Sequence, residues 1–173
     1  RSLCDWSSDV CSSDLDADAH IHHINVNVDD LETAVPFYRD VLGLALDPTP
    51  EQGMASQFFR INDRQQIHMN VLADARAYRG HFCLEVPDFE GVFARAKAAG
   101  AIDTEPWGLV RALPNGKMQM FVRDPHGNLI EVASRPGAEI DPALFEDELV
   151  ESERGIYILP PGAEVGAHTP RTV

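Results

Sequence analysis

Basic residues, cysteines and long apolar runs are all scarce in this chain of 173 residues. It has 14 Lys and Arg against 28 Asp and Glu, and its formal net charge is -14 at pH 7. Such an excess of negative charge disfavours binding to nucleic acid or to an anionic membrane surface. No apolar stretch approaches the roughly 20 residues that a transmembrane helix needs. The composition therefore argues against nucleic acid and membrane as partners, and a small-molecule substrate is expected instead.

The N-terminal segment 1–15 has no hydrophobic period and lacks the apolar core of a signal peptide. It resembles the translated read-through of a sequencing adapter, so no secondary structure is predicted for it. Two of the three cysteines, Cys4 and Cys11, fall in this segment. Only Cys83 remains, which excludes a disulfide framework in the rest of the chain and favours a reducing, cytoplasmic location.

The remaining sequence contains an internal repeat. The segment 23–32, HINVNVDDLE, recurs as HFCLEVPDFE at 81–90. In each copy a histidine begins an alternating strand pattern, which runs into an acidic helix start. Each copy also ends in a second alternating strand with a potential metal ligand, His68 in the first copy and Glu131 in the second. A duplicated module with one or two ligands per copy is an economical way to build one metal site between two halves.

Both copies predict the same order of elements, a strand followed by a helix and three more strands. The first helix is expected over 31–42, with a kink at Pro36. A tight turn is expected at 124–128, before the last strand. The predicted fold class is α+β, with two tandem βαβββ modules at approximately 20–72 and 79–134 that form one domain, 20–134. The acidic extension 135–173 is expected either to pack as an extra helix and strand or to remain a loose tail.

Alternation along the strands places four potential ligands on the face opposite the branched aliphatic residues. His22 falls on the aliphatic side in this pattern, so His23 is the preferred ligand of the two. Imidazole and carboxylate suit a divalent Fe, Zn, Mn, Ni or Co ion rather than a soft metal. The four candidate ligands are His23, His68, His81 and Glu131.

These patterns resemble the vicinal oxygen chelate superfamily, which includes glyoxalase I, extradiol dioxygenases, methylmalonyl-CoA epimerase, and fosfomycin- and bleomycin-resistance proteins. The segments that carry the resemblance are 22–32, 37–44, 66–68, 80–82 and 124–131. The resemblance implies a U-shaped cleft in which a metal binds two neighbouring oxygens of a substrate. By the same match, His23, His81 and Glu131 stand at the usual ligand positions. His68 stands at the remaining one, which is often Glu in glyoxalase I and Gln in the epimerase.

The resemblance implies a metal-dependent reaction, and a glyoxalase I-like lyase or isomerase is the first expectation. Glu131 is the candidate base because it is the only carboxylate of the four, and Glu85, on the same face, is the reserve. One alternative is an Fe(II) extradiol dioxygenase with His23, His81 and Glu131 as its facial set. Another is a metal-free drug-binding resistance protein. Further residues expected to line the substrate cleft are Asn25, Asn70, Cys83 and Arg111.

A homodimer is also expected from the resemblance, because members of this family often pair with a second copy. The site then lies either within one chain or between two chains. The segment 73–80 is short and polar enough to turn back at once, and equally able to extend across to a partner. Pairing of the two modules within one chain is the arrangement that we expect.

Overall fold

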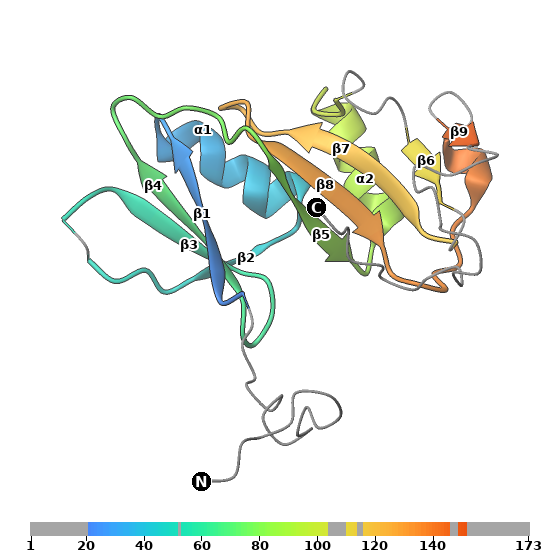
Figure 1. The fold of residues 1–173 in the computed structure, drawn as a ribbon, viewed down its shortest axis with the longest axis horizontal. Coiled ribbons are helices and arrows are strands. Elements are labelled where there is room, and N and C mark those ends of the chain that lie inside the picture. Colours follow the sequence, from blue (N-terminus) through green and yellow to red (C-terminus); the bar gives the residue numbers. More distant parts are fainter. Residues whose placement is uncertain (1–20, 52, 104–109, 114–115, 146–148, 152–173) are drawn as a thin grey trace, which may run out of the picture.

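The computed structural model describes residues 21–51, 53–103, 110–113, 116–145 and 149–151, which form two mixed β-sheets side by side (Figure 1). The strand order is β1-β4-β3-β2 in the first sheet and β5-β8-β7-β6-β9 in the second. In both sheets the first and last strands of the module are parallel neighbours. This arrangement confirms the predicted α+β fold with two tandem βαβββ modules. The segment 1–15 lies outside the described residues.

The elements follow the predicted order in both modules. The first module comprises β1 (His23–Val28), α1 (Leu31–Pro36), η1 (Phe37–Val41), β2 (Ala45–Asp47), β3 (Ser56–Arg60) and β4 (Gln66–Val71). The second comprises β5 (His81–Val86), α2 (Phe89–Ala98), β6 (Val110–Ala112), β7 (Met118–Arg123) and β8 (Leu129–Ser134). The two α-helices, α1 and α2, each begin at an aspartate cap, because the side chains of Asp30 and Asp88 accept hydrogen bonds from the backbone N–H groups of Thr33 and Gly91.

The first helix differs from the kinked helix expected over 31–42. The α-helix ends at Pro36 and continues as the π-helical turn η1, in which the N–H of Leu42 donates to the carbonyl of Phe37 at 3.1 Å. A proline has no N–H with which to continue the α-helical ladder. The chain passes at this point into the wider hydrogen-bonding pattern of a π-helix, so the change lies in helix type.

The extension after the second module adds to the second sheet. A short 3-10 helix, η2 (Pro142–Phe145), leads to β9 (Leu149–Glu151), which pairs parallel with β6. The ring of Phe145 is buried and lies 4.6 Å from that of Phe93, centroid to centroid. The described part of the extension therefore packs as an extra helix and strand, whereas its apolar run at 156–159 lies outside the described residues.

One hydrophobic core extends through both modules. Alternation works as predicted in the two first strands, since their branched aliphatic residues turn inward and their polar residues turn outward. The buried set in these strands is Val26, Val28, Leu84 and Val86, and the exposed set is His23, Asn25, His81, Cys83 and Glu85. None of the helices that the structure describes has the length and apolar character of a transmembrane span.

A buried polar contact joins the modules between η1 and the turn after β7. The hydroxyl of Tyr38, fully buried, donates a 2.9 Å hydrogen bond to the carboxylate of Asp124. The same carboxylate accepts from the backbone N–H and the side-chain amide of Asn128, each at 2.8 Å. Burial and the charge of Asp124 raise the pKa of Tyr38 well above its ordinary value, so the hydroxyl remains a donor.

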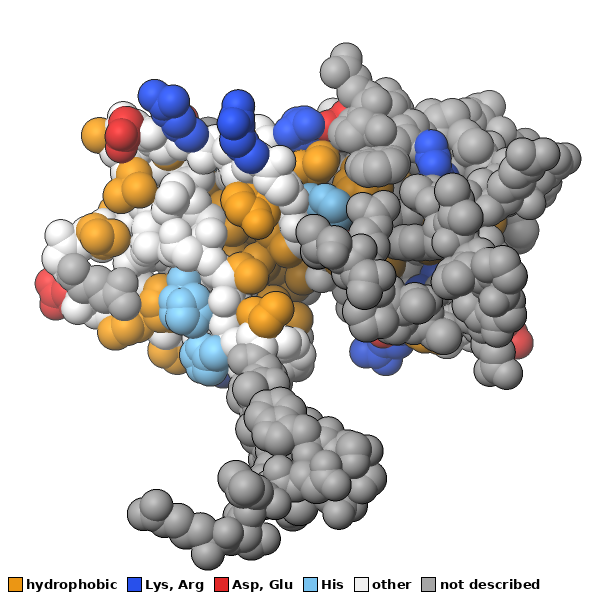
Figure 2. Space-filling view, viewed as in Figure 1, with side chains coloured by type: hydrophobic (Ala, Val, Ile, Leu, Met, Phe, Trp, Pro, Cys, Tyr) orange, Lys and Arg blue, Asp and Glu red, His pale blue; other side chains and the backbone are white. Residues whose placement is uncertain are grey.

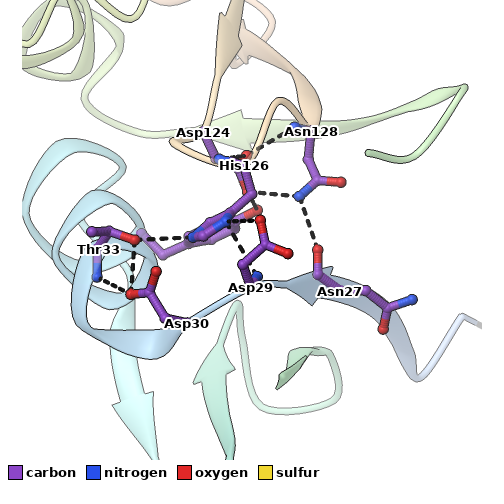
Figure 3. A network of polar contacts seen from close by, with 8 residues as sticks. Asn27, Asp29, Asp30, Thr33, Asp124, His126 and Asn128 are labelled. Atoms are coloured by element: carbon purple, nitrogen blue, oxygen red, sulfur yellow. Dashed lines mark hydrogen bonds and ion pairs between the residues drawn. The ribbon is translucent and has the colours of Figure 1, made fainter. Parts of the chain in front are cut away.

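His126, in the same turn, reaches the start of the first helix (Figure 3). Its Nδ1 accepts from the backbone N–H of Asp29 at 3.2 Å, and its Nε2 lies 3.0 Å from the hydroxyl of Thr33. That hydroxyl donates in turn to Asp30, the cap of α1, at 2.9 Å. The sequence predicts only a tight turn at this place. In the structure, the turn also connects the second module to the first.

We expect Tyr38→Phe to lower the free energy of unfolding by about 1–3 kcal/mol, because it takes one donor from a buried carboxylate. Chemical denaturation followed by circular dichroism measures the change. Tyr78→Phe is the matched control, since Tyr78 is 60% exposed and surface substitutions usually change stability by less than about 0.5 kcal/mol. Equal stability of the two variants would show that the buried contact does not hold the modules together.

Candidate metal centre

The first sheet brings two of the predicted ligands together as stacked rings. His23 on β1 and His68 on β4 have ring centroids 4.0 Å apart and planes 8° from parallel. Phe58 on β3, the register partner of His68, covers the other face of that ring at 3.7 Å and 1°. The His68 imidazole is therefore held between two parallel rings.

His22 also belongs to this cluster, contrary to the expectation that it faces the aliphatic side. It is exposed, its Nδ1 lies 3.0 Å from Nδ1 of His23, and its ring stands edge-on to that of His68 at 6.4 Å. Alternation applies within a strand, and His22 precedes the first residue of β1. It remains outside the candidate ligand set, because it lacks the repeat-related position that His23 shares with His81.

His68 has a hydrogen-bonded support that begins on β2. Its Nε2 lies 2.9 Å from Oε1 of Gln66, and the amide nitrogen of Gln66 donates to Asp47 at 2.5 Å. Asp47 also accepts from the guanidinium of Arg60. Burial lowers the pKa of His68, and the imidazoles of His23 and His22 lower it further. A lowered pKa favours the neutral imidazole, which is the form that binds a metal.

The second sheet brings together the other two predicted ligands. Nε2 of His81 on β5 lies 3.0 Å from Oε2 of Glu131 on β8. The other carboxylate oxygen of Glu131 accepts from the amide of Gln119 on β7 at 2.7 Å, and Gln119 is buried. The ring of Phe121 stands edge-on to His81 at 5.2 Å. Glu131 is thus fixed on both sides, with 14% of its side chain exposed.

The remaining predicted residues line the same faces of the sheets. Cys83 is the register partner of Glu131 and is exposed as a residue, but partial desolvation of its thiol, followed by the charge of Glu131, raises the pKa of that thiol to about 12. Such a thiol is not an activated nucleophile near neutral pH. Glu85, the reserve base, forms a 2.7 Å ion pair with Lys117. This pairing makes Glu85 a weaker candidate base than Glu131.

The amide residues predicted for the cleft form a polar ladder on the first sheet. Asn70 donates to Asn25 at 2.6 Å, and Asn25 donates to Asn27 at 2.8 Å. Oδ1 of Asn70 is buried and has no hydrogen-bond partner among the described residues. Arg111 lies on β6 as the register partner of Gln119, and in the part of the chain that the structure describes its buried Nε has no partner either. Both atoms are buried, so neither is exposed to a substrate in this structure.

The four predicted ligands lie as two separate pairs in this chain. All four residues are described, yet no group of three or more His, Cys, Asp or Glu in the described ranges converges as metal ligands do. Histidine side chains occupy separate places on the surface shown in Figure 2. The His23–His68 pair belongs to the first sheet and the His81–Glu131 pair to the second, and sequence repetition does not determine how the two sheets face each other.

Several residues that support the site were not singled out by the sequence. Gln66 precedes His68 by two residues, so strand alternation already puts it on the ligand face. Gln119 and Asp47 carry no such signal, because each reaches its partner across strands. The repeat extends to Phe58 and Phe121, which are register partners of His68 and Glu131 respectively.

The four candidate ligands are of the chemical types that bind divalent metal ions. Each pair supplies two nitrogen or oxygen donors. His81 and Glu131 are hydrogen-bonded to each other, and a bound cation would replace that hydrogen bond. A surface cavity of about 530 Å³ lies beside the first pair, and its lining includes His22, Asp47, Arg60 and Gln66. Two pairs brought face to face would supply the four donors that the resemblance implies.

Several known protein structures have the same fold as this chain. The chain is similar to the crystal structure of lactoylglutathione lyase from Agrobacterium tumefaciens, with 27% identity and a TM-score of 0.51 over 67% of this chain and 93% of that one. A glyoxalase family protein from Bacillus anthracis (24% identity, TM-score 0.54, 68% and 95% covered) and the oxidase ChaP-H2 (23%, 0.55, 69% and 95%) share the fold. A search of curated protein sequences found no significant match.

The family model called Glyoxalase/Bleomycin resistance protein/Dioxygenase superfamily matches residues 20–132. The match begins just before β1 and ends within β8, so it takes in the strands that carry all four candidate ligands. It agrees with the duplicated modules and with the parallel pairing of first and last strands in each sheet. The chain therefore belongs to the Glyoxalase/Bleomycin resistance protein/Dioxygenase superfamily.

Proposed function

We propose that this chain is a divalent-metal-dependent lyase or isomerase of the glyoxalase I type, acting on a small substrate with two neighbouring oxygens. The observation that carries the proposal is the pair of duplicated ligand positions. His23 and His68 lie together on one sheet, and His81 and Glu131 lie together on the other. A site that only stored an apolar drug would have no use for three imidazoles and a carboxylate at repeat-related positions.

We further propose that the complete site forms between two copies of the chain. The pairs do not converge within one chain, and each pair alone offers too few donors for tight binding. A symmetric dimer would place the first pair of each chain opposite the second pair of its partner and so create two equal sites. This proposal replaces the within-chain arrangement that the sequence favours.

In the proposed reaction, Glu131 takes a proton from one oxygen-bearing carbon of the substrate and returns it to the neighbouring carbon. A bound divalent ion supplies Lewis acidity toward the two substrate oxygens. Glu131 is the only carboxylate among the four candidates, and its two oxygens are oriented by His81 and Gln119. A carboxylate held in this way presents a fixed lone pair to a substrate C–H that the electron-withdrawing oxygens acidify.

The test is a metal analysis of the purified protein combined with measurement of oxygen uptake. The proposal expects Ni, Co, Zn or Mn and isomerisation of a hemithioacetal or related substrate, without oxygen consumption. Iron together with oxygen uptake on catechols would instead establish the dioxygenase, for which His23, His81 and Glu131 suffice as ligands. Failure to bind any of these metals, with tight binding of a drug, would establish the binding protein.

A further inference from the structure

A chain of four polar side chains on β2, β3 and β4 ends at the stacked histidines. Arg60 donates to Asp47, Gln66 donates to Asp47 at 2.5 Å, and Oε1 of Gln66 lies 2.9 Å from Nε2 of His68. We call this chain the Asp47 relay. Among the described residues, no hydrogen bond reaches Nδ1 of His68.

The chemistry of Asp47 determines the direction of every hydrogen bond in the relay. Its side chain is 7% exposed, and the hydrogen bonds from Arg60 and then from Gln66 lower the pKa of its carboxyl group. An ionised carboxylate accepts hydrogen bonds and donates none. Gln66 must therefore turn its NH₂ group toward Asp47 and its carbonyl oxygen toward His68.

We infer that Asp47 is a positioning residue that acts through Gln66 to hold neutral His68 in the tautomer protonated at Nε2. The carbonyl oxygen of Gln66 needs a donor, and in a neutral imidazole only one nitrogen carries the proton. Nδ1 is then the nitrogen that keeps a lone pair for a metal ion. This last step rests on the proposed function, whereas the tautomer itself does not.

The packing around His68 supports the relay. The ring is sandwiched between Phe58 at 3.7 Å and His23 at 4.0 Å, both nearly parallel to it. A ring packed on both faces cannot tilt freely, so Nε2 stays directed at Gln66. Outer hydrogen bonds of this kind orient ligating histidines and fix their tautomer.

The second module provides an internal comparison. It has a similar ion pair, in which Arg123 at the end of β7 contacts Asp103 at 2.6 Å. The residue two positions before its ligand Glu131 is Leu129, which has no hydrogen-bonding group, so the relay cannot continue. A carboxylate ligand has no tautomer to select. The relay is thus present where the ligand is an imidazole and absent from the equivalent place where the ligand is a carboxylate.

The direct test is ¹⁵N NMR of the histidine rings in the metal-free protein at about pH 8, where a neutral imidazole predominates. We expect His68 to carry its proton on Nε2. In Asp47→Asn, the new amide can donate to Gln66 and release its NH₂ group to face His68, so the proton should shift largely to Nδ1. Asp103→Asn, which alters the corresponding pair in the second module, should leave the His68 spectrum unchanged.

A second variant and a second measurement keep the test decisive. Gln66→Leu, which copies the second module, should give a mixture of tautomers if Asp47→Asn does not fold. Titration of the same proteins with Zn²⁺ should show about 10–100-fold weaker binding in both relay variants, and none of this loss in Asp103→Asn.

The outcomes separate the relay from the proposed function. A wild-type His68 protonated at Nδ1, or relay variants with an unchanged tautomer, would overturn the inference. Unchanged Zn²⁺ affinity despite a changed tautomer would overturn the role of the relay in metal binding. A wild-type protein that shows the expected tautomer but binds no metal would refute the proposed function and leave the tautomer assignment standing.

Discussion

Glu131→Ala and His81→Ala should each abolish stoichiometric metal binding. Each substitution removes one of the two donors that the second sheet contributes. Substituting a residue that hydrogen-bonds to a metal ligand already lowers the metal affinity about 10–100-fold. Removing the ligand itself should therefore lower the affinity by more than about 100-fold. Isothermal titration with Zn²⁺ or Ni²⁺, together with metal analysis after gel filtration, measures the loss. His68→Ala should weaken binding less, because Glu131, His81 and His23 still form a two-histidine, one-carboxylate set.

Glu85→Gln is the matched control for this experiment. Glu85 lies on the same face of the second sheet as Glu131, but it is paired with Lys117 at 2.7 Å and is not a proposed ligand. Its substitution should leave the metal content of the protein unchanged. Equal and stoichiometric metal retention in the Glu131, His81 and His68 variants would show that the ligand assignment is wrong.

Mixing two inactive proteins, His23→Ala and Glu131→Ala, should restore about a quarter of the metal sites once the subunits have exchanged. Random exchange makes half of the dimers mixed, and one of the two sites in each mixed dimer then holds an intact ligand set. The reason is structural, because His23 belongs to the first sheet and Glu131 to the second, and the pairs do not converge in one chain. Metal content and activity are measured before and after exchange.

The control is a mixture of His81→Ala with Glu131→Ala. Both changes affect the same pair, so no combination of these two chains rebuilds a complete site in either arrangement. Mass spectrometry of intact dimers confirms that exchange has taken place. If exchange is complete and the His23 and Glu131 mixture stays inactive, each site lies within one chain and the between-chain proposal fails.

The order of the secondary-structure elements, and the strand face on which each ligand lies, were predictable because both depend on residues that are neighbours in the sequence. Period-two alternation in β1 and β5 places Val26 and Leu84 in the core and leaves His23 and His81 outside. The cap of α1 by Asp30 is equally local. The pattern failed at strand ends, where His22 joins the His23 ring although alternation assigns it to the other side.

The support of each ligand was not predictable, because it depends on strands that meet only in the folded sheet. Asp47 lies on β2 and reaches Gln66 on β4, and Gln119 on β7 reaches Glu131 on β8. The contact of Tyr38 with Asp124 spans the two modules. Register and sheet order decide such contacts, and both arise from the packing of whole modules.

Repetition, periodicity and motif spacing are properties of the chain, so the amino-acid sequence predicts the duplicated βαβββ plan, the family and the four candidate ligands. The folded structure adds that the ligands lie in two pairs on separate sheets, that Gln66 and Asp47 support His68, and that the turn at 124–128 contacts the first module. This division arises because a repeat specifies each module with its own hydrophobic face, whereas the relative placement of two modules depends on how those faces share one core.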